Sequence, residues 1–205
     1  MNKMFLDHKQ PLSTCIDSDC ENCIVKKDLN CHFNLKQLIR FIAIVLPAAI
    51  IGGYGIFIFN PIYIIAWIPL FIIYFGFVEI RVMCSHCPHY AEPNLKSLKC
   101  WANYGSPKLW KYRPGPMTVM EKFVFKTGAL IIFAYPIPFL FLKYGIQSYV
   151  LLGLYCISII VALFLLKKYY CSHCINFACP LNNVDKEVRS KFFAKNQVVK
   201  DAWKQ

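Results

Sequence analysis

The sequence predicts an all-α integral membrane protein with four transmembrane helices, arranged as two repeated helical hairpins, and with cysteine-rich cytoplasmic segments. Of the 205 residues, 57% are hydrophobic and only 17% are charged, whereas a soluble domain normally has about a quarter charged residues. The tetrapeptide Cys-Ser-His-Cys occurs twice. The apolar residues gather in four stretches, 41–59, 62–77, 125–142 and 148–166.

Each stretch is close to the roughly 20 residues that a helix needs to cross a hydrocarbon core about 30 Å thick. Three of them contain no charged side chain, and the third in order contains only Lys126, near its start. Four buried helices in a soluble protein of this length would leave too few polar residues to cover them. The sequence therefore favours four membrane spans over a soluble bundle.

Short connections pair the spans. Asn60 and Pro61 join the first two stretches, and residues 143–147 join the last two. Neither connection is long enough to be a domain, so each pair is expected to form a helical hairpin. Prolines should bend the first three helices, at Pro47, Pro69, Pro136 and Pro138.

Basic residues set the expected orientation. Of the 23 Lys and Arg residues, only Lys143 falls in a hairpin connection. Because Lys and Arg stay on the cytoplasmic side, both termini and the central loop are expected there, in a multi-pass protein of the cell (inner or plasma) membrane. The net charge of +12 would attract anionic lipid headgroups. Nucleic acid is not an expected partner, since charge retention explains the excess. The first apolar run is expected to remain as a signal anchor.

Five segments are expected along the chain. The same number of residues separates Asn60 from Cys84 and Gln147 from Cys171, and a basic residue stands three places before each first cysteine. This spacing favours an internal duplication over convergence. The segments are a cysteine-rich N-terminal part (1–38), a first hairpin ending in Cys-Ser-His-Cys (39–87), a loop rich in proline, aromatic and basic residues (88–121), a second hairpin ending in Cys-Ser-His-Cys (122–174) and an amphipathic tail (175–205).

The loop has the composition of a segment at the membrane surface. Its five prolines exclude a continuous helix. Trp101, Trp110 and Tyr112 are expected at headgroup depth, with neighbouring basic residues on phosphates. A binding loop for an anionic cofactor is the alternative interpretation. Near the first tetrapeptide, Glu79 is expected to pair with a neighbouring base such as Arg81.

The tail carries Val184, Val188 and Phe192 on one face of a helix. Such a face predicts a helix that lies on the membrane. A helix that docks a cytosolic protein has the same pattern, so a protein partner is also expected.

Ten of the 11 cysteines map to the cytoplasmic face in this topology, and Cys156 lies inside the fourth span as a packing residue. Disulfides are not expected in a reducing compartment, where clustered cysteines more often bind metal or do redox chemistry. If the topology were inverted, disulfides would be the leading interpretation. The candidate metal ligands are Cys84, Cys87, Cys171 and Cys174 as the core set, then Cys100 and Cys179, with His86, His89 and His173, and the N-terminal Cys15, Cys20, Cys23 and Cys31.

Two residues between cysteines let one turn direct both sulfurs at a single ion. Four thiolates then complete a shell for zinc or hold an iron–sulfur cluster, and the sequence does not decide between these two cofactors. Cys179 precedes Pro180, as in ferredoxin cluster runs, but without the bacterial spacing, while the histidines slightly favour zinc. One shared site and two separate sites both stay open. The N-terminal set has enough cysteines for a site of its own, with a spacing that we match to no standard pattern.

The function favoured at this point is a membrane metalloprotein that transfers electrons or handles thiol redox at its cytoplasmic face, within a membrane complex. A zinc-stabilised scaffold or accessory protein that recruits a cytosolic partner is the first alternative, and metal trafficking is the second. No paired catalytic carboxylates, nucleophile motif or phosphate-binding glycine loop identifies an enzyme.

Overall fold

The computed structural model describes residues 9–143 and 145–204, and its regular secondary structure in those residues is helical, apart from one isolated bridge between Ser97 and Pro107. Four helical stretches are long and apolar enough to cross a membrane. This confirms the expected four spans and the all-α class. The stretches are Leu35–Phe59, Ile62–His86, Val119–Leu142 and Ile146–His173.

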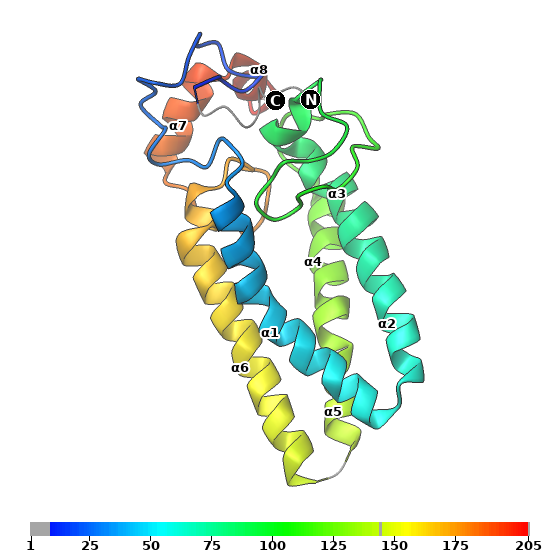
Figure 1. Cartoon of the computed structure of the whole chain (residues 1–205). Coiled ribbons are helices and arrows are strands. Elements are labelled where there is room, and N and C mark those ends of the chain that lie inside the picture. Colours follow the sequence, from blue (N-terminus) through cyan, green and yellow to red (C-terminus); the bar gives the residue numbers. More distant parts are fainter. Residues whose placement is uncertain (1–8, 144, 205) are drawn as a thin grey trace.

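The spans are built from nine helical pieces (Figure 1). The first is α1 (Leu35–Phe59), and the second joins α2 (Ile62–Ile73), the π-helix η2 (Tyr74–Val78), α3 (Glu79–Val82) and the 3-10 turn η3 (Cys84–His86). The third joins α4 (Val119–Ala134) to α5 (Pro136–Leu142), and the fourth joins α6 (Ile146–Tyr169) to the 3-10 turn η5 (Cys171–His173). Outside the spans lie η4 (Pro88–Ala91), α7 (Lys186–Lys195) and α8 (Gln197–Ala202).

Polar side chains mark where these helices begin and end. The Asn34 side chain accepts a hydrogen bond from the Lys36 N–H and caps α1, and Asn60 ends α1 while its side chain accepts from the Ile62 N–H. Thr118 and Glu121 form a capping box at the start of α4. The tight connection before α6 contains Gly145 with a φ of 132°, a conformation open chiefly to glycine.

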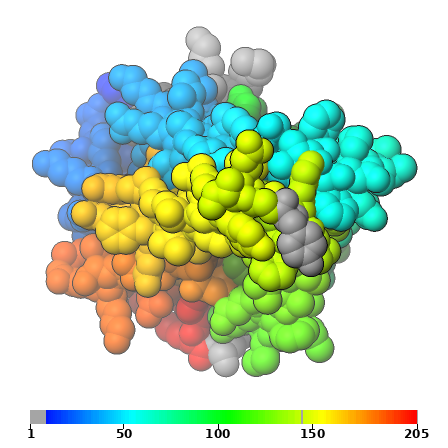
Figure 2. Space-filling model, turned by 90° about the horizontal axis from the view of Figure 1, so that it is seen from below, coloured from blue at the N-terminus to red at the C-terminus, as the bar shows by residue number. Residues whose placement is uncertain are grey.

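The two pairs of spans pack into one bundle. Helix α1 lies against α5 and α6 as well as against its own neighbour α2, while α4 contacts α2 and α5. Figure 2 looks along the bundle from the end opposite the cysteines and shows the start of α6 (yellow) against the cyan part of the chain. A Cβ at Gly55 would overlap Leu140, so glycine lets α1 approach α5 closely. The outer faces stay apolar and exposed, with Ile65 at 70% and Leu130 at 67% exposure, as lipid contact requires.

Residues 9–34, the central loop and the segment after α6 gather at one end of the bundle, which we call the cysteine-rich end (Figure 1). Trp101 is buried there and packs between Phe41 and Tyr170, with ring centroids 5.3 and 4.9 Å away. Trp110 and Tyr112 pack on the hydrophobic cluster around the first tetrapeptide. These three aromatic side chains therefore pack against the protein, with Trp110 and Tyr112 only partly buried, and their depth relative to the headgroups stays a prediction.

Helix α7 also turns its apolar face inward. Phe192 is 1% exposed, and Val184 and Val188 pack on the same hydrophobic cluster, which includes Phe177. The interpretation of this face as a membrane-lying surface is wrong, because the N-terminal segment and residues after α6 already cover it.

Gly128 tests the packing of the bundle. A Cβ at this position of α4 would overlap the ring of Tyr74, whose hydroxyl donates to the Phe125 carbonyl at 2.6 Å. We expect Gly128→Ala to lower the free energy of unfolding by about 1–3 kcal/mol, because overpacking displaces that ring. Thermal unfolding in detergent micelles, followed by circular dichroism, measures the effect. Gly153→Ala is the matched control, since a Cβ there meets open space; an equal loss in both variants would contradict the assignment.

Candidate metal centre

The two Cys-Ser-His-Cys tetrapeptides adopt the same local structure. Each forms one 3-10 turn directly after its span. In the first, Ser85 Oγ donates to the carbonyl of Arg81 at 2.6 Å, and in the second, Ser172 Oγ donates to the carbonyl of Lys168 at 2.6 Å. The basic residues that precede the cysteines thus supply the acceptors that hold each turn onto its helix.

The structure brings the second cysteines of the two tetrapeptides near one another. Burial raises the pKa of Cys174 well above its usual value, and the neighbouring Cys87, Cys100 and Cys179 thiols raise it further. Charge effects of this kind act over short distances. The buried Asn176 side chain ties the two turns together, because its Nδ2 donates to the Met83 carbonyl at 3.3 Å. Four segments of the chain therefore meet at these sulfurs.

For each of these four thiols, the backbone N–H of the residue two places later lowers the pKa. Burial is the largest cause of the raised pKa of every one of these thiols, and the N–H group acts against it by stabilising the thiolate. For Cys179 the pKa is raised to about 12. The donors and acceptors are His89 to Cys87, Ala102 to Cys100, Asn176 to Cys174 and Leu181 to Cys179.

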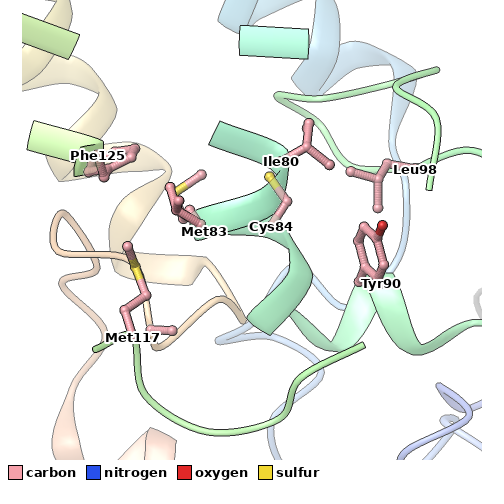
Figure 3. Packing of buried hydrophobic residues seen from close by; sticks show 9 residues of the cluster. Ile80, Met83, Cys84, Tyr90, Leu98, Met117 and Phe125 are labelled. Atoms are coloured by element: carbon pink, nitrogen blue, oxygen red, sulfur yellow. The ribbon is translucent and has the colours of Figure 1, made fainter. Parts of the chain in front are cut away.

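Cys84 also lies near three of these thiols, those of Cys87, Cys100 and Cys179. Its sulfur accepts a hydrogen bond from Asn103 Nδ2 at 3.2 Å, and Figure 3 shows its side chain among Ile80, Leu98 and Tyr90. The Asn103 side chain also lies near the buried Glu79 carboxylate. The expected pairing of Glu79 with Arg81 is wrong, because that guanidinium lies 3.6 Å from a different carboxylate.

Cys171 is connected to the group through one neighbour. Its charge raises the pKa of Cys179, after burial, whereas the charges that act on Cys174 come from Cys87, Cys100 and Cys179. The two cysteines also have different backbone partners. The Cys171 carbonyl accepts from the Asn183 N–H, whereas the Cys174 carbonyl accepts from Asn182 Nδ2. Of the sequence-based core set, Cys84, Cys87 and Cys174 thus lie near Cys100 and Cys179, and Cys171 lies near Cys179.

The candidate histidines contact protein groups. His86 Nδ1 donates to the Gly115 carbonyl at 3.1 Å, and its Nε2 lies 3.4 Å from Glu121. His89 Nε2 donates to the Cys31 carbonyl at 3.0 Å, and burial lowers its pKa to about 4, so the ring is neutral. His173 Nδ1 lies 2.9 Å from the neighbouring serine hydroxyl. One ring nitrogen of each candidate histidine therefore has a hydrogen-bond partner within the protein.

The N-terminal cysteines lie against the other side of the first tetrapeptide. Cys20 is buried, and Cys15, Cys23 and Cys31 are half-buried against the hydrophobic cluster that contains Cys87. No three His, Cys, Asp or Glu side chains in residues 9–143 and 145–204 already stand where the ligands of one metal ion would stand. The cysteines are gathered but do not close a coordination shell. Their all-sulfur chemistry and their N–H donors fit a thiolate-bound metal.

Comparisons with known proteins find no matching family model, no matching curated protein and no matching solved structure.

A charged network supports the first tetrapeptide. Arg113 Nη1 lies 2.6 Å from Glu121 Oε1, and Arg113 also donates to Ser85 Oγ and to the Arg81 carbonyl. Glu121 in turn lies beside His86. This network links the central loop, the start of α4 and the turn η3. Sequence reasoning missed it, and the only signal was the Thr-x-x-Glu pattern that opens α4.

Glu121→Gln tests this network. Glutamine can keep the capping box but removes the negative charge between Arg81 and Arg113, so we expect a loss of about 1–2 kcal/mol in the free energy of unfolding. Chemical unfolding in micelles measures it. Glu187→Gln, which breaks the exposed pair with Lys191 on α7, should cause no measurable change. Equal effects would show that the network contributes no more than a surface pair.

Proposed function

We propose that this chain is a multi-pass membrane metalloprotein that transfers electrons at one membrane face, through an iron–sulfur centre held by Cys87, Cys100, Cys174 and Cys179. The observation that carries the proposal is the convergence of these four sulfurs, each with a backbone N–H aimed at it. Four thiolates are the usual ligands of such a cluster, which exchanges one electron at a time.

The hydrogen bonds favour a thiolate centre. A thiol is a weak hydrogen-bond acceptor, whereas a thiolate gains from every N–H donor that points at it. Burial alone would keep these thiols protonated, as their raised pKa values indicate. A bound metal supplies the positive charge that offsets four thiolates away from water. The same N–H donors would tune the reduction potential of the centre.

The surrounding protein suits an electron-transfer site. The hydrophobic clusters around Cys84 and Cys87 keep water from the centre, with Ile80 fully buried and Ile175 only 1% exposed. Protein segments from both hairpins, the loop and the tail hold the sulfurs, which limits reorganisation when the charge changes. We place this face on the cytoplasmic side because the basic residues are retained there, and we infer that it meets a redox partner within a membrane complex.

The two hairpins are proposed to be an old duplication. The shared 3-10 turn and the two serine-to-carbonyl bonds of equal length support it. In a duplicated pair the site lies between the repeats, and here the second cysteine of each tetrapeptide contributes to it. The central loop and the tail then add one ligand each, Cys100 and Cys179.

A zinc-stabilised scaffold is the second candidate function. It is favoured by one observation, namely that the four sulfurs come from four separate segments, which a closed zinc site would hold together. Such a protein would be colourless and would contain zinc in place of iron and sulfide.

The ligand set is tested by serine substitutions in anaerobically purified protein. We expect Cys100→Ser and Cys179→Ser to lower the iron and acid-labile sulfide per chain and to weaken the visible absorption, because each removes one of four ligands. Cys171→Ser should leave the metal content nearly unchanged, and Cys156→Ser, inside α6, is the matched control for loss of a thiol. Full occupancy in the Cys179→Ser protein, or loss in the Cys171→Ser protein, would contradict the proposed set.

A further inference from the structure

A long groove runs between α1 and α6 on the outer surface of the bundle. The two helices lie side by side (Figure 1), and the groove between them has a volume of about 770 Å³. This volume lies within the range of roughly 300–1,000 Å³ that is typical of ligand sites. Leu154, Ile157 and Val161 of α6 line it, and the short side chains of Ala43 and Pro47 on α1 leave the space open. Ile157 is 58% exposed, so the groove opens toward the lipid.

Two contacts hold α1 against α6 near the ends of this groove. At the cysteine-rich end the Tyr170 hydroxyl donates to the Gln37 carbonyl at 3.3 Å. Deeper in the bundle the ring of Tyr155 lies so close to Gly52 that an added Cβ would meet it at 2.9 Å. The packing of the two helices therefore fixes the groove between these points.

The length of the groove matches one leaflet of a bilayer. Its lining on α1 includes Arg40 at one end and Ile51 at the other. These residues are about 16 Å apart along the helix, at roughly 1.5 Å per residue. One leaflet of a hydrocarbon core about 30 Å thick spans about 15 Å. The apolar part of the groove therefore suits an acyl chain that lies along the two helices.

Basic and aromatic side chains stand where the groove meets the cysteine-rich end. Arg40 and Tyr169 line it there and are exposed, and Lys167 and Lys168 lie in the last turn of α6. Among the residues that the structure describes, every ion pair involves other basic side chains, so Arg40 has no carboxylate partner. Tyrosine and basic residues are typical of headgroup depth, and basic sites between membrane helices bind anionic headgroups.

We propose that this groove binds one anionic glycerophospholipid from the leaflet at the cysteine-rich end, with its phosphate on Arg40 and one acyl chain along α1 and α6. The guanidinium can donate two parallel hydrogen bonds to a phosphate, and the nearby lysines favour a headgroup with a net negative charge. Because α1 belongs to the first hairpin and α6 to the second, the bound lipid joins the two hairpins beside the second tetrapeptide. The site does not depend on the proposed function, since no cysteine or histidine lines it.

Other occupants fit the charge of the groove less well. The four spans of a second copy of the chain carry only two carboxylates, Glu79 and Glu121. Glu79 is buried and Glu121 pairs with Arg113, so a second copy has no free carboxylate in its spans to neutralise Arg40. A neutral isoprenoid lipid would fill the apolar part of the groove but would leave the guanidinium without a counter-charge.

Native mass spectrometry of the full chain in detergent tests the headgroup site, with phosphatidylglycerol and phosphatidylcholine as the added lipids. We expect the wild type to bind one phosphatidylglycerol more tightly than phosphatidylcholine. Arg40→Gln should weaken phosphatidylglycerol binding about fivefold, the effect of losing one basic residue at a membrane surface. Lys126→Gln is the matched control and should bind like the wild type, because Lys126 is an exposed basic residue near the start of α4, at the same end of the bundle, and does not line the groove.

A second pair of variants tests the place of the acyl chain. Ala43→Phe puts a large side chain into the groove from an exposed position, so we expect it also to weaken phosphatidylglycerol binding. Ile42→Phe changes the next residue, which is exposed outside the groove, and should have no effect. Added phosphatidylglycerol should raise the thermal unfolding midpoint of the wild type and of Ile42→Phe more than that of Arg40→Gln and Ala43→Phe, because a ligand stabilises the state that binds it. Circular dichroism before heating shows that each variant is folded.

Several outcomes would overturn the inference. Equal binding of the two lipids by the wild type would refute it, as would undiminished phosphatidylglycerol binding in either the Arg40→Gln or the Ala43→Phe protein. A dimer that Ala43→Phe abolishes would identify the groove as a contact between copies of the chain. A neutral isoprenoid lipid extracted from the purified protein in place of phospholipid would identify a different ligand. Metal analysis of the same samples separates the two proposals, since absence of iron with intact lipid binding contradicts only the proposed function.

Discussion

The cysteine-rich end depends on the protonation state of its buried cysteine side chains. A buried thiol stays protonated and packs like a small apolar group, whereas a buried thiolate needs donors and a counter-charge. The N–H groups aimed at Cys87, Cys100, Cys174 and Cys179 supply the donors. An apolar packing role would not need these donors, so they favour a thiolate more than burial does.

The bundle determines which segments can reach those sulfurs. Because α1 packs on α5 and α6, the segment that precedes α1 arrives beside the turn that follows α6, and the Asn30 N–H donates to the His173 carbonyl there. The central loop starts at the first tetrapeptide and returns to α4, so it covers that side. Close contacts at Gly55 with Leu140 and at Gly128 with Tyr74 let α1 lie near α5 and α4 lie near η2.

The spans could be predicted from the sequence because an uncharged apolar run of about 20 residues is typical of a membrane-spanning helix. The two copies of the tetrapeptide lie at one end of the bundle, because they follow the second and the fourth span. The long-range polar contacts could not be predicted: Asn103 lies 19 residues from Cys84, and no local pattern marks it as a donor to that sulfur. Phe192 was misplaced because an amphipathic helix on a membrane and a helix covered by another part of the chain have the same periodicity.

The two tetrapeptides share a backbone but differ in their covers, and this difference bears on the duplication. Ser85 is fully buried and receives Arg113 from the central loop, whereas Ser172 is half-buried and bonds within its own turn. The N-terminal segment precedes the first hairpin, and the central loop precedes the second. The Asn30 N–H of the N-terminal segment donates to the His173 carbonyl in the second tetrapeptide, and Arg113 of the central loop donates to Ser85 in the first. If the hairpins arose by duplication, these two covers are the parts that diverged. The N-terminal segment now carries four cysteines, and the central loop carries Cys100 and the charged network of Arg113 and Glu121.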